Sequence, residues 1–182
     1  MMGEQNNHST SSYSSRHENE TETRRLPDFL GIGTQKGGTT TLHDLLRRDK
    51  RIGLPRKKEV HYFDQEELLP VKWYADQFIE LSNQLVVGEI TPYYMHDSLA
   101  PIRIKETIPD VKLIALLRDP VDRAISQYFH SRRKGFDHES LINAMELEDE
   151  RMATGGRYSH QKHSYITRSK YDEQLDRYLG IF

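Results

Sequence analysis

Short apolar runs alternate with amphipathic stretches from residue 26 to the end of the 182-residue chain. Three runs are short and apolar enough to predict buried strands, at residues 29–33, 85–88 and 111–117. Apolar residues at helical spacing predict helices over residues 40–48, 120–129 and 171–180, and we also expect helices over 71–82, 97–107 and the charged stretch 137–155. Asp119 and Pro120 supply an N-cap and a first helical residue for one of them. Strands that alternate with helices predict an α/β fold, in which helices flank a parallel sheet as a three-layer sandwich.

The two ends of the chain depart from this pattern. Residues 1–25 contain no Leu, Ile, Val, Phe or Trp, so they cannot bury enough apolar surface to offset the entropy of ordering. We therefore predict a disordered tail there. At the other end, only two residues follow the helix predicted over 171–180, whereas a final helix of an α/β fold normally leads into another strand. We expect one domain over residues 26–182 that is incomplete at its C-terminus.

Composition and charge exclude several classes of protein. The 26 Lys and Arg residues nearly balance the 28 Asp and Glu residues, which argues against a nucleic-acid partner. Without cysteine, the sequence offers no disulfide, zinc–thiolate site or catalytic thiol. His160 and His163 lie three residues apart without a supporting carboxylate arrangement, so we predict no metal site. No run approaches the roughly 18 apolar residues of a membrane helix.

The most informative segment is the glycine- and threonine-rich loop over residues 33–41, between the first predicted strand and the first predicted helix. Backbone N–H groups and the helix dipole form an anion site at such a junction, and glycine lets the backbone approach a phosphate closely. The loop resembles the G-x-x-x-x-G-K-[ST] phosphate-binding loop, which leaves a P-loop kinase or ATPase as an alternative. However, Thr39 stands where that loop has lysine, and the lysine of this segment is Lys36. A generic Gly-rich turn with helix-capping threonines is the simplest alternative.

Four segments together resemble the sulfotransferases that use 3′-phosphoadenosine 5′-phosphosulfate (PAPS). Residues 34–40 look like the family's 5′-phosphosulfate loop, and residues 118–128 are similar to its 3′-phosphate segment. Residues 58–64 and 88–94 are similar to the K-E-x-H-F-F-D and G-E-K-T-P-x-Y segments of heparan-sulfate N- and 3-O-sulfotransferases. The resemblance implies a P-loop-like sulfotransferase domain over residues 26–182, with PAPS as co-substrate and no metal.

The resemblance also implies roles for individual residues. Lys36 would lie against the bridging oxygen between sulfate and phosphate, where negative charge develops as the S–O bond breaks. Glu59 would take the proton of the attacking group, with His61 as its helper, so the implied catalytic set is Lys36, Glu59 and His61. The implied cofactor-binding set is Thr34, Gln35, Lys36, Gly37, Gly38, Thr39, Thr40, Arg118 and Ser126.

Without the resemblance, surface ion pairs are the simpler interpretation for two of these residues. Glu59 would pair with one of the two preceding lysines at the surface. Arg118 would pair with Asp119 or Asp122 instead of a phosphate.

The expected acceptor and location follow from departures from the family pattern. Where the heparan-sulfate-type segment has lysine after Glu89, this chain has Ile90, so a neutral sugar or another small molecule is as plausible as a highly sulfated glycan. We expect a hydroxyl or amine of a carbohydrate or small molecule. Golgi members of the family carry a membrane anchor and usually a disulfide, and this sequence shows neither, which predicts a cytoplasmic enzyme with no membrane partner. An inactive fragment or nucleotide-binding pseudoenzyme is the alternative.

Overall fold

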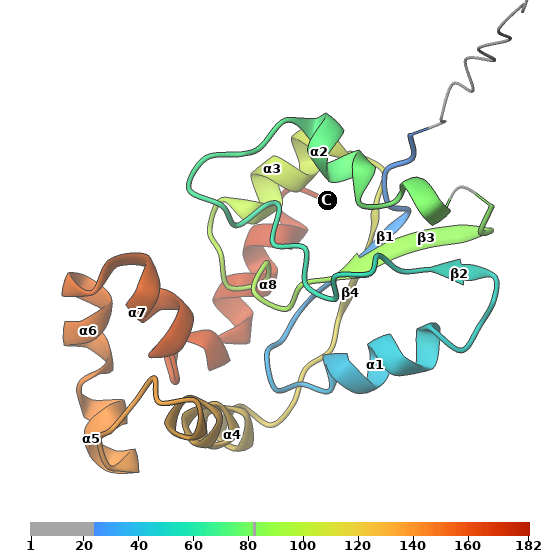
Figure 1. Ribbon diagram of the computed structural model, residues 1–182. Helices are drawn as coiled ribbons and strands as arrows, with labels where there is room; N and C mark the ends of the chain where they lie inside the picture. The colour runs from blue at the N-terminus through green and yellow to red at the C-terminus, as the bar shows by residue number, and fades with distance from the viewer. Residues whose placement is uncertain (1–23, 82) are drawn as a thin grey trace, which may run out of the picture.

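Four parallel strands form a sheet in the order β2-β3-β1-β4 (Figure 1). The computed structural model describes residues 24–81 and 83–182. The strands are β1 (Phe29–Gly33), β2 (Ile52–Gly53), β3 (Val86–Ile90) and β4 (Lys112–Ala115). β1 pairs in parallel with both β3 and β4. The three strands predicted from the sequence are therefore present and adjacent, and the two-residue β2 extends the sheet beside β3.

Helices follow the strands and flank the sheet. They are α1 (Thr39–Leu46), α2 (Val71–Asp76), α3 (Ala100–Thr107), α4 (Pro120–Arg133), α5 (Leu141–Glu146), α6 (Glu148–Thr154), α7 (Gly156–Lys162) and α8 (Tyr171–Leu179), with the 3₁₀ turns η1 (Ile79–Leu81) and η2 (Thr167–Ser169). This arrangement confirms the predicted α/β fold with a parallel sheet. Two predicted helices are each divided, into α2 and η1 and into α5 and α6. Apolar spacing does not reveal these divisions, because it persists across a short break.

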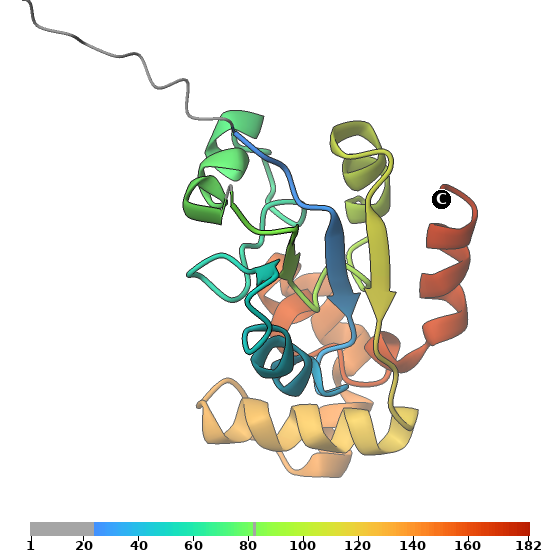
Figure 2. The same ribbon diagram turned by 90° about the vertical axis from the view of Figure 1, so that its right-hand side faces the viewer.

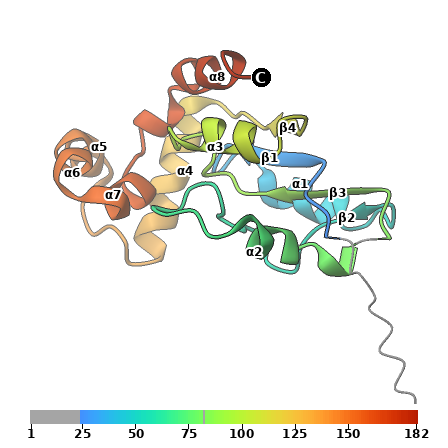
Figure 3. The same cartoon turned by 90° about the horizontal axis from the view of Figure 1, so that it is seen from above.

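The carboxyl ends of the parallel strands meet at one edge of the sheet. The loop after β1, the turn after β3 and the segment after β4 therefore come together there, as ligand-binding loops do in open α/β sheets. Helix α4 lies across this edge (Figure 2), and α5, α6 and α7 gather on the side of α4 away from the strands (Figure 3). The fold thus brings the glycine-rich loop near the helix that begins at Pro120.

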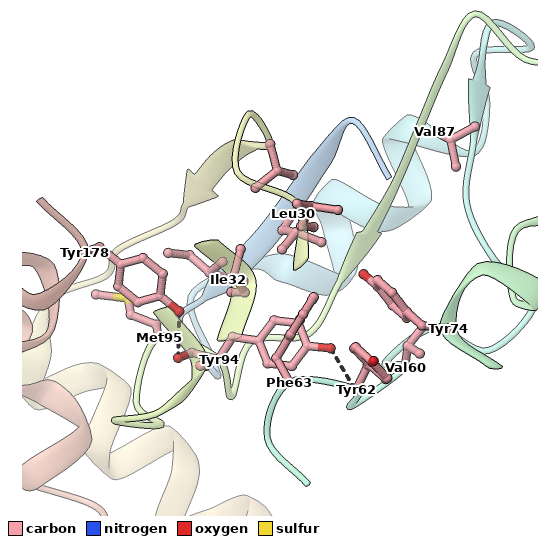
Figure 4. Packing of buried hydrophobic residues seen from close by; sticks show 14 of the residues in the cluster. Leu30, Ile32, Val60, Tyr62, Phe63, Tyr74, Val87, Tyr94, Met95 and Tyr178 are labelled. Atoms are coloured by element: carbon pink, nitrogen blue, oxygen red, sulfur yellow. Dashed lines mark hydrogen bonds between the residues drawn. The ribbon is translucent and has the colours of Figure 1, made fainter. Parts of the chain in front are cut away.

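An aromatic-rich core packs on one face of the sheet (Figure 4). Leu30 and Ile32 share this face of β1, because alternate residues of a strand point to the same side. The ring of Tyr62 stacks on that of Tyr74, with centroids 4.3 Å apart, and Tyr94 is fully buried beside them. The core therefore attaches the segment around residue 62, which carries two of the implied catalytic residues, to the strands of the sheet.

The predicted N-terminal tail lies almost entirely outside the described residues, which begin at Arg24. The Nε atom of Arg24 lies 2.9 Å from Oδ1 of Asp76. Arg25 donates a hydrogen bond of 2.7 Å to the carbonyl oxygen of Gln84. The last two residues of the predicted tail therefore contact the folded domain.

Candidate active site

The glycine-rich loop passes from β1 into α1 through a tight turn. The N–H of Thr34 donates to the carbonyl oxygen of Leu116 at 2.7 Å, and the N–H of Gly37 donates to the carbonyl oxygen of Thr34 at 2.9 Å. A Cβ atom at Gly37 would lie 2.7 Å from the Leu116 oxygen, so a larger residue does not fit. Gly38, the N-cap of α1, has φ of 98°, a left-handed conformation that favours glycine. The predicted strand, loop and helix order is therefore confirmed.

A cavity of about 490 Å³ opens above this turn, and we call it the loop cavity. Its walls come from four segments of the chain: Gln35, Lys36, Gly38, Thr39, Thr40, Lys58, Glu59, Pro92, Arg118, Ser126 and His130. Most of the implied cofactor-binding residues are thus brought to one cavity. Thr34 and Gly37 are not among its walls, because Thr34 is buried beneath the turn and Gly37 packs against the Leu116 carbonyl.

Positive charge dominates the loop cavity. The pKa of Lys36 is lowered by burial and by the cations of Arg133, Arg118 and Lys58. The Nζ atom of Lys58 donates to Oγ1 of Thr40 at 2.7 Å. Several cations held close together at the N-terminus of a helix complement an anion with more than one negative charge. The residues of the loop cavity therefore fit a phosphosulfate.

Glu59 and His61 lie in the segment between β2 and α2, where His61 has a left-handed φ of 57°, and their side chains are in contact. Oε2 of Glu59 lies 3.4 Å from Nε2 of His61, and Nδ1 of His61 lies 2.8 Å from Oδ2 of Asp64. Burial opposes the charge on His61, but hydrogen bonds to Asp64 and Glu59 outweigh it and raise the pKa of His61 to about 9. His61 is therefore a cation at neutral pH between two carboxylates.

The Glu59 carboxylate is ionised at neutral pH. Burial alone would raise the pKa of Glu59, yet the hydrogen bond from His61 and the charges of His61 and Lys58 lower it below the usual value. Nζ of Lys58 lies 3.7 Å from Oε1 of Glu59. The sequence alternative, in which Glu59 pairs with a preceding lysine, is therefore present in part. Glu59 also pairs with His61, which that alternative did not include.

Three consecutive backbone N–H groups anchor this segment to the end of β3. The N–H of Val60 donates to Oε2 of Glu89 at 3.4 Å, and that of His61 donates to Oγ1 of Thr91 at 3.4 Å. The N–H of Tyr62 donates to the hydroxyl of Tyr94 at 2.8 Å. These acceptors are themselves connected, because Glu89 accepts hydrogen bonds from the hydroxyls of Tyr74, Thr91 and Tyr94 at 2.7, 2.8 and 2.9 Å. This network sets where the Glu59 and His61 side chains emerge.

A second cavity of about 800 Å³ adjoins the first, and we call it the outer cavity. Its walls include Lys57, His61, Tyr93, Arg157, Lys162 and Arg168. Gln35, Glu59 and Pro92 line both cavities and form a shared wall. Two ligands placed in the two cavities would therefore meet at this shared wall, next to the Glu59 carboxylate.

Helix α4 begins as the sequence predicted. Oδ1 of Asp119 accepts from the N–H of Asp122 at 2.9 Å, so Asp119 is the N-cap, and Pro120 is the first helical residue. Arg118 reaches the loop cavity, although its Nη2 also lies 3.5 Å from Oδ2 of Asp122 in a half-exposed pair. Such a pair is weak in water, so it does not prevent Arg118 from binding an anion.

Sequence reasoning missed several residues that shape the site. Asp64 orients His61, and Arg157 lies 3.8 Å from the same carboxylate. Arg168 reaches Gln35 from a position 133 residues further along the chain. Asp64 was within a segment already identified as similar to a family motif, but nothing in the local pattern around Arg157 or Arg168 distinguishes them from surface arginines.

Fold and site together define a class of protein: a parallel α/β domain with a cationic anion-binding loop and a carboxylate beside it. The chain belongs to the sulfotransferase family, because the sulfotransferase domain matches residues 26–176. The crystal structure of a sulfotransferase from Alicyclobacillus acidocaldarius superimposes with a TM-score of 0.78 at 27% identity, and the match covers 87% of this chain and 70% of that one. The family predicted from the four segments is confirmed, and the P-loop kinase or ATPase alternative has no support.

Two relatives show which members of the family this chain is similar to. It is 42% identical over 109 residues to the membrane-associated sulfotransferase kil1 of Dictyostelium discoideum, which covers 58% of this chain and 23% of that protein. It is 36% identical over 111 residues to human heparan sulfate glucosamine 3-O-sulfotransferase 3B1, which covers 61% of this chain and 28% of that protein. The match therefore spans about a quarter of the length of these two relatives.

The predicted cytoplasmic location is wrong. It rested on the absence of an anchor and a disulfide, whereas the Dictyostelium relative is membrane-associated and the human relative is named for heparan sulfate. Because the match spans about a quarter of these relatives, the absence of an anchor and a disulfide from this sequence does not indicate a location. Within residues 24–81 and 83–182, none of the helices has the length and apolar character needed to span a bilayer.

Proposed function

We propose that this chain carries a site that transfers the sulfuryl group of PAPS to a hydroxyl or amine of a carbohydrate acceptor. The observation that carries the proposal is the position of Glu59 on the wall shared by the loop cavity and the outer cavity. A carboxylate there would face the donor on one side and the acceptor on the other. Membership of the sulfotransferase family supports the reaction, and the heparan sulfate relative supports a carbohydrate.

The donor would lie in the loop cavity. Its 5′-phosphosulfate end suits the N–H groups at the start of α1, together with Lys36 and Lys58. Its 3′-phosphate suits the guanidinium of Arg118 and the hydroxyl of Ser126, which both line this cavity.

In the transfer, an acceptor oxygen or nitrogen forms a bond to sulfur as the bond from sulfur to the bridging oxygen breaks. The electron pair of that bond stays on the bridging oxygen and yields 3′-phosphoadenosine 5′-phosphate (PAP), and the proton of the acceptor passes to the Glu59 carboxylate. Lys36, as a cation, stabilises the charge that develops on the bridging oxygen. His61 orients the Glu59 carboxylate and is itself oriented by Asp64.

The acceptor would enter through the outer cavity. Lys57, Arg157 and Lys162 line it together with the carboxylates of Glu66 and Glu67, so it offers groups of both charges to a polar sugar. Ile90, which replaces the lysine of heparan-sulfate-type members, lines neither cavity. It is fully buried, and a Cβ atom at Gly31 would lie 2.9 Å from its side chain. The isoleucine therefore contributes to the wall of neither cavity.

Calorimetric titration with PAP, with ATP as the control nucleotide, tests the donor site. We expect PAP to bind more tightly than ATP, because Arg118 and Ser126 would meet a 3′-phosphate that ATP lacks. Equal affinity for the two nucleotides would overturn the assignment of the donor site.

A transfer assay with ³⁵S-labelled PAPS then tests the reaction, with N-sulfated heparan oligosaccharides and uncharged malto-oligosaccharides as acceptors. Label in either oligosaccharide supports the proposal, and the similarity to the heparan sulfate relative favours the heparan oligosaccharides. Tight PAP binding without label in either would reject the carbohydrate acceptor and leave a nucleotide-binding domain.

A further inference from the structure

Arg168, in η2, is a buried cation among neutral hydrogen-bond acceptors. Arg168 is only 1% exposed, and none of the carboxylates in residues 24–81 and 83–182 forms an ion pair with it. Buried arginines are usually paired with carboxylates, because an uncompensated charge is costly to remove from water. Arg123 is buried among neutral acceptors as well, but of these two arginines Arg168 is the one that lines the outer cavity.

The guanidinium of Arg168 connects three segments of the site. Its Nη1 donates to Oε1 of Gln35 in the glycine-rich loop. Its Nη2 donates to the carbonyl oxygens of His160 and Gln161 at 2.8 and 3.1 Å, at the end of α7. Its Cζ atom lies over the ring of Tyr93, which follows β3, at 5.0 Å from the ring centroid. Arg168 thus places the Gln35 side chain relative to two walls of the outer cavity.

The hydrogen bond from Arg168 also decides which way the Gln35 amide points. A guanidinium only donates hydrogen bonds, so the amide oxygen must face Arg168. The amide NH₂ then faces away from Arg168. Gln35 lines both the loop cavity and the outer cavity, on the same shared wall as Glu59. The donor end of the amide is therefore available to a ligand that spans the shared wall.

We propose that Arg168 is a positioning residue that holds Gln35 so that its amide NH₂ donates to the sulfuryl oxygens of PAPS. This inference rests on the proposed function, because it requires PAPS in the loop cavity. The sulfuryl group is the part of PAPS that passes through the shared wall, and its oxygens carry negative charge. An amide that accepts from a cation is polarised, and its NH₂ becomes a stronger donor. Although burial lowers the pKa of Arg168 to about 10, the guanidinium stays charged at neutral pH.

The decisive comparison is between PAPS and PAP, which differ by the sulfuryl group alone. Gln35→Glu keeps an oxygen for Arg168 and nearly the same shape, but it replaces the NH₂ with a second carboxylate oxygen. We expect the affinity for PAPS, measured by calorimetric titration without an acceptor, to fall about tenfold or more, the loss expected for a hydrogen bond to a charged group. The affinity for PAP should change much less. Gln77→Glu, on the surface after α2, is the control for the added charge.

The outcomes distinguish a failure of the proposed function from a failure of the role proposed for Gln35. If the unaltered chain binds neither nucleotide in preference to ATP, the proposed function fails. If it binds both, and Gln35→Glu lowers the two affinities equally or neither of them, the function stands and the role of Gln35 is wrong. A selective loss of PAPS affinity in Gln35→Glu, absent in Gln77→Glu, supports the role.

A double-mutant cycle tests Arg168 itself. In Arg168→Gln, Gln35→Ala and the double variant, the losses of PAPS affinity should be strongly non-additive if Arg168 acts through Gln35. Arg123→Gln is the matched control, because Arg123 is also a buried arginine that donates to neutral oxygens but does not reach Gln35. Additive losses, or an equal loss of PAP affinity, would assign Arg168 to structure only. If Arg168→Gln does not fold, the comparison of Gln35→Glu with Gln77→Glu still decides the role of the amide.

Discussion

The carboxylate of Glu59 and the imidazole of His61 are in contact, with Oε2 of Glu59 3.4 Å from Nε2 of His61. Because Asp64 lies 2.8 Å from the other ring nitrogen, the imidazole is charged and both of its N–H groups are donors. A charged His61 has no free lone pair and cannot itself accept a proton at neutral pH. The geometry therefore assigns proton acceptance in the proposed reaction to Glu59 and orientation to His61.

Replacing Glu59 by glutamine should remove the proton acceptor without removing the donor site. We expect kcat with the labelled oligosaccharide to fall by roughly 10²–10⁴, the usual contribution of a general base. The affinity for PAP should change little, because PAP has no sulfuryl group next to the shared wall. Single-turnover transfer and calorimetry on the same preparation measure the two effects. Glu67→Gln, on the outer cavity but away from the shared wall, is the comparison, and an equal loss in both variants would contradict the role of Glu59.

The stabilising effect of His61 should depend on pH. Its pKa is about 9 in the folded chain and near 6.5 in an unfolded one, so its charge favours the folded state fully below pH 6.5. This contribution should be lost as the pH rises from about 6.5 through 9. The difference in free energy of unfolding between the unaltered chain and His61→Gln, from urea unfolding at pH 6 and pH 9.5, should therefore shrink. A constant difference would mean that His61 is neutral in the folded chain.

Lys36 should matter more for the rate of transfer than for binding of the product. Lys36→Ala removes the cation expected at the bridging oxygen, and we expect kcat to fall by about 10²–10³, as when one electrostatic stabiliser of a transition state is removed. Lys50→Ala, on the exposed segment after α1, should have no effect on the rate. Transfer from labelled PAPS under saturating donor tests both variants. Full turnover by Lys36→Ala would exclude the assigned role.

The network around Glu89 should contribute to stability as well as to the position of Glu59. Tyr94→Phe removes the acceptor for the N–H of Tyr62 and one donor to Glu89, and both groups are buried. We expect a loss of about 1–3 kcal/mol in the free energy of unfolding, the cost of leaving buried polar groups unpaired. Urea unfolding measures it, with Tyr158→Phe on the exposed face of α7 as the control. Equal stability of the two variants would show that water replaces the lost hydroxyl.

Much of the fold follows from local patterns in the sequence. The apolar run at β1, the glycine-rich loop and the periodic α1 appear in order, because each depends on residues within a few positions of one another. The N-cap at Asp119 was predictable for the same reason, since its side chain bonds to a backbone N–H three residues later. The division of the 71–82 stretch was not, because packing against the core, and not spacing, decides where α2 ends.

For the site, the sequence by itself determined which chemical groups are available: a lysine within an anion-binding loop, a glutamate with a nearby histidine, and an arginine at a strand end. Only the tertiary structure decided which of them share a cavity. The contact between Arg168 and Gln35 spans 133 residues, and the shared wall of Gln35, Glu59 and Pro92 joins segments that follow β1, β2 and β3. Such distances depend on strand order and register, and these are set by packing between distant residues, which no local pattern encodes.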